Sequence, residues 1–287
     1  MAVRSAGLPA PTVGAPTVGA RTSAWVVAVR EAALLLALLF AYSRIRLAAS
    51  DDRAAAVRHG LDVLRLERLL HLDVEAAVNG ALGQVPVLAV AASYWYAALH
   101  YTVTPLALVL LYRHRPGEYR RLRTALVLAT SAALVGYVAL PTAPPRLVGG
   151  YVDTLLSTSP LGWWGAEGSA VRGAGGAVDQ FAAMPSMHVG WALWCGLVFW
   201  RLARSRWQRA LALGYPAITA VVVVATANHW VLDVLAGAAL VAAAWVGVLR
   251  VGVLRVGVLR GHRGDRPRRP VPVARAVSSA ATPAGRR

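Results

Sequence analysis

The chain has 287 residues, of which 57% are hydrophobic and only 15% are charged. An ordinary soluble domain is about 45–50% apolar and about 25% charged, so this composition excludes a typical water-soluble protein. The formal net charge is +17, and the single cysteine, Cys195, excludes an intrachain disulfide and a cysteine-based metal cluster.

The apolar residues gather into long runs that predict six transmembrane helices. Most runs approach the ~20 residues that a helix needs to cross a bilayer core, and backbone groups in lipid must be satisfied within the segment. Pro105 predicts a kink or a tilt in the second run. The runs are Ala24–Tyr42, Val85–Tyr112, Thr124–Leu140, Pro185–Trp200, Ala210–Ala227 and Trp230–Leu249.

The first run has two interpretations. Arg4 and Arg21 resemble the basic region of a cleaved signal peptide, but no small-residue cleavage site follows the run closely. Arg30 and Glu31 also interrupt the run. We favour a retained helix in which this pair faces the bundle or the interface, because an isolated charge at mid-bilayer costs a few kcal/mol.

The remaining segments predict the domain organisation. Residues 51–83 place apolar side chains at spaced positions among charges, which predicts one or two interfacial amphipathic helices. Residues 1–23 and 250–287 are predicted to be tails, and the second is basic and largely disordered because it is rich in Arg, Pro and Ala. The membrane domain is therefore expected to occupy residues 24–249.

The arginines are divided unequally between the two sides that six spans define. The side that contains both termini has 21 arginines against two acidic residues, a net charge of +19, and the other side has eight against nine, a net charge of −1. Positive loops stay in the cytoplasm, so we expect a multi-pass protein of the cell membrane with both termini inside. This split explains the basic character without nucleic acid as a partner. The first side comprises 1–23, 113–123, 201–209 and 250–287, and the second comprises 43–84 and 141–184.

Three polar motifs lie at the predicted external ends of the spans. Pro141–Arg146 (PTAPPR) follows the third span, Met184–His188 (MPSMH) opens the fourth, and Asn228–Asp233 (NHWVLD) opens the sixth. The topology was deduced from charge and hydropathy alone, so the meeting of the motifs on one side of the membrane is an independent observation. It is the strongest functional signal in the sequence.

The residues of these motifs suit phosphoryl transfer. Pro185 is suited to the first turn of a helix, which leaves Ser186 beside free backbone N–H groups that can bind phosphate. His229 and Asp233 are four residues apart on one helical face, so the carboxylate can bind one ring nitrogen and leave the other as a nucleophile. Arg146, after two prolines, offers a planar donor for phosphate oxygens.

Other functions fit parts of the same pattern. His188, His229 and Asp233 are also a set of metal ligands, but phosphate chemistry explains Ser186 and Arg146 as well. A membrane hydrolase would use Ser186 as nucleophile and His188 as base, but these residues are only two apart. A transporter with a His/Asp proton relay would need polar residues near mid-bilayer, whereas the polar residues gather at one end.

Pro185–His188 and the pair His229 and Asp233 resemble the motifs of the membrane-bound type 2 phosphatidic-acid phosphatase superfamily, which shares its fold with vanadium haloperoxidases. Pro141–Arg146 looks more like the branch that contains inositol phosphorylceramide synthase. The resemblance covers roughly residues 24–249. It implies an all-α polytopic membrane protein whose helical bundle is of the phosphatidic-acid phosphatase/vanadium haloperoxidase kind.

The resemblance also implies roles. His229 would attack phosphorus and form a phosphohistidine, Asp233 would orient and activate it, and His188 would protonate the leaving group. Ser186 and Arg146 would hold the phosphate, and no metal or other cofactor is implied. The expected activity is a lipid phosphatase or phosphotransferase acting on a lipid phosphate, diphosphate or phosphoinositide at the extracytoplasmic face. An inositolphosphoryl-type headgroup transferase is the alternative, and the sequence specifies no oligomeric state.

Two features depart from the family pattern. The family has a Lys several residues before its first Arg, and this chain has no Lys. The family also has a Ser-Arg pair shortly before the nucleophilic His, where this chain has Val222 and Val223. The missing cations argue against efficient hydrolysis of simple phosphomonoesters and suit a diester-like or diphosphate lipid, or headgroup transfer to an alcohol. His100, flanked by tyrosines, is interpreted as a satisfied core histidine rather than a pocket residue.

Overall fold

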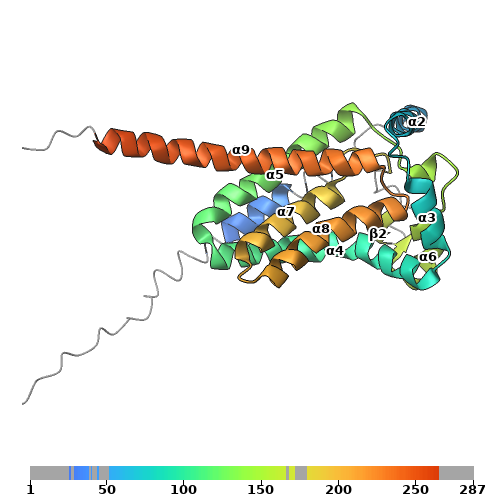
Figure 1. Cartoon of the computed structure of the whole chain (residues 1–287), viewed down its shortest axis with the longest axis horizontal. Coiled ribbons are helices and arrows are strands. Elements are labelled where there is room, and N and C mark those ends of the chain that lie inside the picture. Colours follow the sequence, from blue (N-terminus) through green and yellow to red (C-terminus); the bar gives the residue numbers. More distant parts are fainter. Residues whose placement is uncertain are drawn as a thin grey trace, which may run out of the picture.

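Five long helices form the body of the protein and run side by side (Figure 1). The computed structural model describes residues 52–165, 168–171 and 180–264, together with residues 26, 29–38, 40 and 44. Helix α7 packs against all four of the other bundle helices, so it occupies the centre. The five helices are α4 (Pro86–His114), α5 (Pro116–Ala139), α7 (Met187–Leu202), α8 (Arg206–Ala225) and α9 (Val231–Gly264).

Local signals set where these helices begin. Pro86 and Pro116 occupy the first positions of α4 and α5, where the missing N–H has no intrahelical partner to lose. Ser205 starts α8 with a capping box, because its hydroxyl accepts from the Gln208 N–H and the Gln208 side chain accepts from the Ser205 N–H. Helix α4 continues through Pro105 and keeps its full length.

Four helices are long and apolar enough to cross a membrane: α4, α5, α8 and residues Val231–Val251 of α9. The expectation of six spans is not confirmed. Helix α7 begins at Met187 rather than at Pro185 and has 16 residues. At 1.5 Å per residue it is about 24 Å long, which is less than the ~30 Å of a bilayer core.

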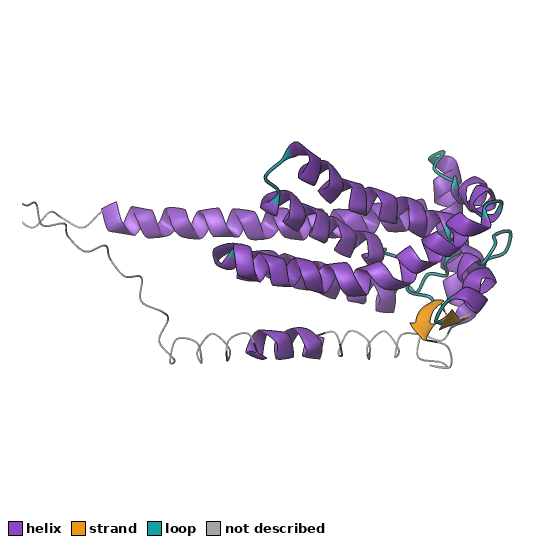
Figure 2. Cartoon of the chain, turned by 90° about the horizontal axis from the view of Figure 1, so that it is seen from below, coloured by secondary structure: helices purple, strands orange, loops and turns teal. Residues whose placement is uncertain are grey.

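The first predicted span lies partly outside the described residues. Residues 29–38 are helical and run along the bundle (Figure 2). Glu31 forms an ion pair with Arg123 of α5 at 2.6 Å, and both side chains are mostly buried. Glu31 therefore faces the bundle, as the sequence predicts, whereas Arg30 is exposed.

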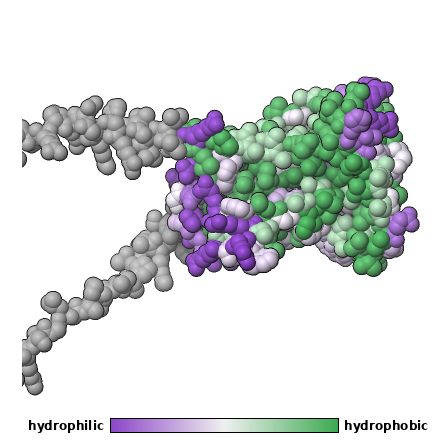
Figure 3. Space-filling model, viewed as in Figure 1, coloured by the Kyte–Doolittle hydropathy of each residue, from purple (hydrophilic) through white to green (hydrophobic). Residues whose placement is uncertain are grey.

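The small elements gather at one end of the bundle (Figure 1). On the face that Figure 3 shows, an apolar region lies between two hydrophilic ends, which suits a surface in contact with a lipid bilayer. The small elements are α2 (Arg53–Leu69), α3 (Glu75–Gly83), α6 (Thr154–Thr158), the single turns Pro145–Leu147 and Ser159–Leu161, and the antiparallel strands β1 (Trp164–Gly165) and β2 (Gly168–Val171).

The predicted amphipathic segment 51–83 contains two helices, α2 and α3. The buried side of α2 is formed by Ala56, Gly60, Val63 and Glu67, while its leucines remain partly or fully exposed. Leucines left uncovered by protein suit a membrane interface, so the interfacial placement of α2 stays a prediction.

The predicted basic tail begins inside a helix. Helix α9 continues to Gly264, so residues 250–264 are helical rather than disordered. The repeated VGVLR sequence contains no Pro that would end the helix continuing from the preceding apolar run. Residues 265–287 and residues 1–23 lie outside the described residues.

Helices α7 and α9 cross in close backbone contact where the polar motifs lie. A Cβ atom at Gly237 of α9 would be 2.0 Å from the carbonyl oxygen of Ser186, which directly precedes α7. Across the crossing, a Cβ atom at Gly190 would be 3.3 Å from the Gly237 carbonyl oxygen. The absence of a side chain at Gly237 therefore fixes how near the two motif-bearing helices can approach.

We predict that Gly237→Ala destabilises the protein by about 1–3 kcal/mol, because its methyl group must push Ser186 away. Gly247→Ala is the matched control on the same helix, since a Cβ atom there meets nothing within 4 Å. We expect the control to be neutral or stabilising by up to about 1 kcal/mol, as helix propensity dictates. Thermal unfolding in detergent–lipid micelles measures the difference. Equal melting temperatures for the two variants would contradict the tight crossing.

Candidate active site

Backbone hydrogen bonds tie the three polar motifs together at one end of the bundle. The Thr142 carbonyl accepts from the Ala183 N–H at 3.2 Å, which joins the first motif to the segment that leads into the second. The Arg146 N–H donates to the Ala227 carbonyl at 3.0 Å, and the Ser186 N–H donates to the Asp233 carbonyl at 2.9 Å. The motifs that the sequence predicts to meet are therefore adjacent, and each is bonded to its neighbours.

His229 is held in one tautomer. Its Nδ1 atom lies 2.9 Å from the Ala183 carbonyl oxygen and 3.5 Å from Oδ2 of Asp233. A carbonyl oxygen can only accept, so Nδ1 carries the proton and Nε2 keeps its lone pair. The predicted pairing with Asp233 is thus present as a longer contact, and Ala183 makes the shorter one. His229 is 3% exposed, so protein atoms hold the ring rather than solvent.

The lone pair of His229 points toward the second histidine. Nε2 of His229 lies 3.4 Å from Nδ1 of His188, and the two rings meet at an interplanar angle of 60°. His188 in turn stacks on Tyr96 with ring centroids 4.2 Å apart. His100 is buried, as expected of a core histidine, and it packs edge-on against His188 with ring centroids 4.5 Å apart, which places it at the site.

Ser186 occupies the position before the first residue of α7. The helix begins two residues later than the sequence suggests, so Pro185 precedes the helix instead of forming its first turn. The Ser186 hydroxyl oxygen is buried, and among the described residues no hydrogen-bond partner reaches it. The first N–H groups of a helix carry partial positive charge, so a buried hydroxyl beside them is suited to an anionic oxygen.

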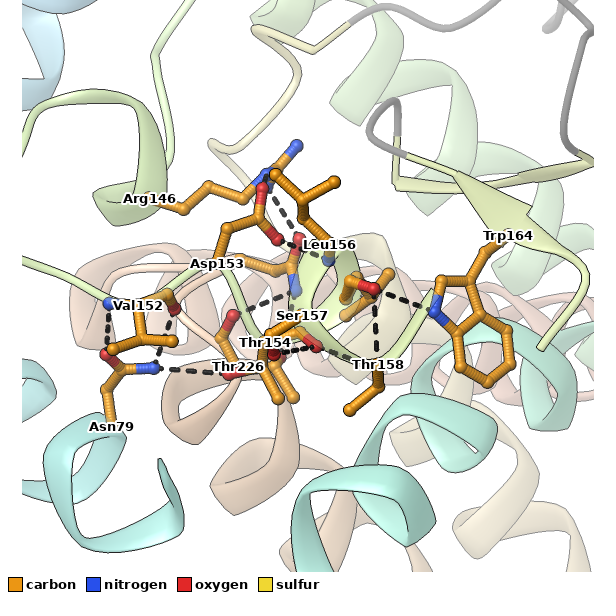
Figure 4. Close-up of polar contacts among 12 residues, drawn as sticks. Asn79, Arg146, Val152, Asp153, Thr154, Leu156, Ser157, Thr158, Trp164 and Thr226 are labelled. Atoms are coloured by element: carbon orange, nitrogen blue, oxygen red, sulfur yellow. Dashed lines mark hydrogen bonds and ion pairs between the residues drawn. The ribbon is translucent and has the colours of Figure 1, made fainter. Parts of the chain in front are cut away.

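Arg146 is fixed between a carboxylate and the residue that precedes His229 (Figure 4). Its Nε atom lies 3.6 Å from Oδ2 of Asp153, and a terminal nitrogen donates to Oδ1 of Asn228 at 2.6 Å. Asp153 also caps α6 by accepting from the Leu156 N–H at 3.0 Å. The guanidinium is therefore oriented beside the nucleophile candidate, and its charge is partly balanced.

Asn79 of α3 supports the loop that carries Asp153 (Figure 4). Its amide nitrogen donates to the carbonyls of Val152 and Ala225, and its amide oxygen accepts from the Val152 N–H at 2.8 Å. Asn79 is 2% exposed, so these bonds form away from water. The side chain thereby links the loop before α6 to the end of α8.

Three carboxylates bind the first N–H groups of α9. Oδ2 of Asp233 accepts from the Trp230 N–H at 2.8 Å, Oε1 of Glu75 from the Val231 N–H at 2.9 Å, and Oε1 of Glu67 from the Leu232 N–H at 2.7 Å. All three carboxyl groups are fully buried. Burial, together with the hydrogen bond and negative charge of Glu75, raises the pKa of Glu67 to about 8.

The positions of these groups argue against a metal centre built from the two histidines and Asp233. Asp233 faces Nδ1 of His229, whereas His188 faces Nε2 on the opposite edge of the same ring. Ligands on opposite edges of one imidazole cannot converge on a single ion. Within the described ranges, no group of three or more His, Cys, Asp or Glu side chains has the arrangement of a metal site.

Sequence reasoning missed several of these residues. Tyr96 lies among the tyrosines near His100, and Glu67 and Glu75 lie among the charges of the amphipathic segment 51–83, so neither position indicates a part in the site. A signal for Glu67 exists, because it continues the Ala56–Gly60–Val63 spacing that forms the buried side of α2. The contacts of Asp153 and Asn228 with Arg146 had no local signal.

The fold and the site together define a multi-pass membrane protein with a histidine pair at one end of its bundle. Residues 61–247 match the family model described as the PAP2 superfamily. The chain therefore belongs to this superfamily, whose members are generally phosphatases and phosphotransferases. Comparisons with curated proteins and with solved structures gave no match.

One buried hydrogen bond offers a test of the site's framework. The Tyr137 hydroxyl of α5 donates to the Pro185 carbonyl at 2.8 Å. Tyr137→Phe leaves that buried acceptor without its partner, so we expect a loss of about 1–3 kcal/mol in unfolding free energy. Tyr101→Phe, the same change at a side chain that is 58% exposed, should alter stability by less than about 0.5 kcal/mol. Thermal unfolding of both variants gives the comparison, and equal losses would contradict the anchoring role of Tyr137.

Proposed function

We propose that the protein is a lipid phosphatase or phosphotransferase that works through a phosphohistidine on His229. The observation that carries the proposal is the placement of His229, whose Nδ1 atom contacts the Ala183 carbonyl beside Asp233 while its Nε2 atom faces His188. An imidazole whose orientation and tautomer are fixed through Nδ1 is suited to act as a nucleophile through Nε2. PAP2 superfamily membership supports the reaction class.

The chemistry balances with the residues present. Nε2 of His229 attacks phosphorus, an N–P bond forms, and the bond between phosphorus and the leaving oxygen breaks while His188 gives that oxygen a proton. Water or an alcohol then attacks the phosphohistidine and loses its proton to His188, and the N–P bond breaks. The imidazolium-like charge that develops on His229 is stabilised by Asp233. The phosphate must displace the contact between the two rings to reach Nε2 of His229, and the α7 N-terminus and Ser186 can then meet its oxygens.

The charge at the site favours a substrate with a single negative charge on phosphorus, such as a phosphodiester lipid. Arg146 is the cation beside the histidines, and Asp153 lies 3.6 Å from it. The position seven before His229 is Val222, and the next is the fully buried Val223, so no cation enters from α8 there. Transfer of a phosphoryl headgroup to an alcohol, as in the inositol phosphorylceramide synthase-like branch, therefore suits this site better than hydrolysis of a dianionic monoester.

We also propose the membrane arrangement that the arginines predict. Six spans, with the segment near residues 24–42 and the short α7 added to the four long helices, would place both termini in the cytoplasm of a cell-membrane protein. The histidine pair would then face the extracytoplasmic side, where α2 and α3 lie on the interface. The net charge of +19 on the opposite side supports this orientation.

The covalent step has a direct test. His229→Ala removes the attacking nitrogen, so we expect both turnover and trapped phosphoenzyme to disappear when a labelled phospholipid is mixed with the protein and quenched within milliseconds. His188→Ala should slow the first step most for poor leaving groups, because a good leaving group needs no proton. His114→Ala, at an exposed histidine on the other end of α4, is the control and should keep both signals. Phosphoenzyme in the His229→Ala protein would exclude His229 as the nucleophile.

The orientation has a separate test in intact cells. In a Cys195→Ala background, Leu161→Cys places a thiol on a side chain that is 62% exposed at the end with the histidines. We expect a membrane-impermeant maleimide to label it without permeabilisation. Arg204→Cys, in the exposed turn between α7 and α8, should label only after permeabilisation. The reverse labelling pattern would show that the protein has the opposite orientation in the membrane.

A further inference from the structure

Two buried glutamates outside the histidine pair have no assigned role. Glu67 of α2 and Glu75 of α3 are both 0% exposed, and each binds one N–H group at the start of α9 through its Oε1 atom. The helix N-terminus compensates part of one negative charge, about half an elementary charge. Two ionised carboxylates beside the buried Asp233 therefore exceed what the helix can stabilise.

The second oxygens of the two glutamates show how the excess charge is resolved. Oε2 of Glu67 and Oε2 of Glu75 are both buried, and across the described chain no donor reaches either of them. Because the two carboxyl groups bind consecutive N–H groups of the same helix start, they lie next to each other, and Glu75 acts on the pKa of Glu67 as a hydrogen-bonding neighbour. A contact between two acceptors requires a proton, so one hydrogen between these oxygens satisfies both and removes one charge.

We propose that Glu67 and Glu75 are positioning residues that share one proton and thereby lock the N-terminus of α9, with His229 and Asp233, in its reactive placement. The glutamates act close to the site, because the N–H groups they bind belong to Val231 and Leu232, which lie between His229 and Asp233 in the chain. The catalytic part of this proposal rests on the proposed function. The retention of the proton does not.

The surroundings of the pair favour the neutral form of one member. Burial, the hydrogen bond with Glu75 and the charges of Glu75 and Asp233 all raise the pKa of Glu67, while the Leu232 N–H lowers it, and the result is about 8. The Tyr151 hydroxyl also faces the pair, and its pKa is raised by burial first and then by Glu75. The other charged groups that face this cluster are Arg68 of α2, Asp73 of the α2–α3 turn and His229 beside Asp233.

The sign of the pH dependence follows from the shifted pKa. Glu67 holds its proton up to about pH 8 when folded and loses it near 4.5 when unfolded, so the unfolded state binds fewer protons between these values. The stability contributed by the pair is therefore complete below about pH 4.5 and is lost as the pH rises to about 8. Glutamine is an isostere of the protonated acid and donates at every pH, so Glu67→Gln should remove this slope.

The experiment measures melting temperature and turnover from pH 4.5 to 9.5 in the full-length protein in lipid micelles. We expect the melting temperature of Glu67→Gln to rise relative to that of the unaltered protein as the pH increases to about 8. Above that pH the difference between the two melting temperatures should stay constant. At pH 7 its turnover should stay within about twofold, and the alkaline fall in turnover should move to higher pH. Glu75→Gln should behave alike, whereas Asp73→Asn, at an exposed carboxylate nearby, should change neither profile.

The double variant gives a signature that a simple structural role would not. With both Oε1 positions accepting from α9, Glu67→Gln combined with Glu75→Gln turns two amide groups toward each other with donors only. We expect at least a tenfold loss of turnover and a melting temperature below that of either single variant. Glu67→Ala should also lower the melting temperature and the turnover, because the Leu232 N–H loses its acceptor.

Three results would overturn the proposal. The first is parallel melting profiles of Glu67→Gln and the unaltered protein between pH 4.5 and 8, which would mean that no proton is retained. The second is an equal loss of melting temperature and turnover in Glu67→Gln and Glu67→Ala. The third is an alkaline loss of stability that sodium or potassium ions prevent, which would place a cation between the oxygens. If no variant and no unaltered sample turns over lipid, the proposed function fails while the melting profiles still decide whether the proton is shared.

Discussion

The placement of the histidine pair depends on how the N-terminus of α9 is held. Three consecutive N–H groups, from Trp230 to Leu232, are each bound by a different buried carboxylate at 2.7–2.9 Å. Free N–H groups at a buried helix end would each cost about 1–3 kcal/mol, so these bonds decide where α9 can begin. His229 directly precedes the bound groups and Asp233 supplies one of the carboxylates. The bonds that fix the start of α9 therefore also fix the positions of these two site residues.

The second constraint is the close crossing of α7 and α9. Gly237 allows the Ser186 carbonyl to lie against the α9 backbone, and the Ser186 N–H then reaches the Asp233 carbonyl at 2.9 Å. This bond brings the α7 N-terminus and the Ser186 hydroxyl to the face where His229 projects. A larger residue at Gly237 would separate the N-terminus of α7 from the nucleophile candidate, although every polar side chain of the site would be unchanged.

The electrostatics of the site support the proposal of a phosphodiester substrate. Around the histidines lie the helix N-terminus, the Ser186 hydroxyl and Arg146, whose charge is shared with Asp153 and whose direction is fixed by Asn228. On the far side of His229, Asp233 and the glutamates of α2 and α3 add negative charge. A dianionic phosphate would meet too little positive charge here, whereas a monoanionic diester needs less compensation.

The sequence by itself determined the class of protein and the identity of the three motifs. Long apolar runs and the unequal arginines depend only on local composition, and the His229–Asp233 spacing is a property of any helix. The sequence also predicted that the motifs meet, because span ends share a membrane face. The short α7, the Ala183 bond that fixes the His229 tautomer, and the place of His100 beside His188 were decided by the tertiary structure. So was the capping of α9 by glutamates that lie 156 and 165 positions earlier in the chain. Local sequence cannot reveal such contacts, because a buried acid and a solvated one look alike until the helix that needs them is packed against them.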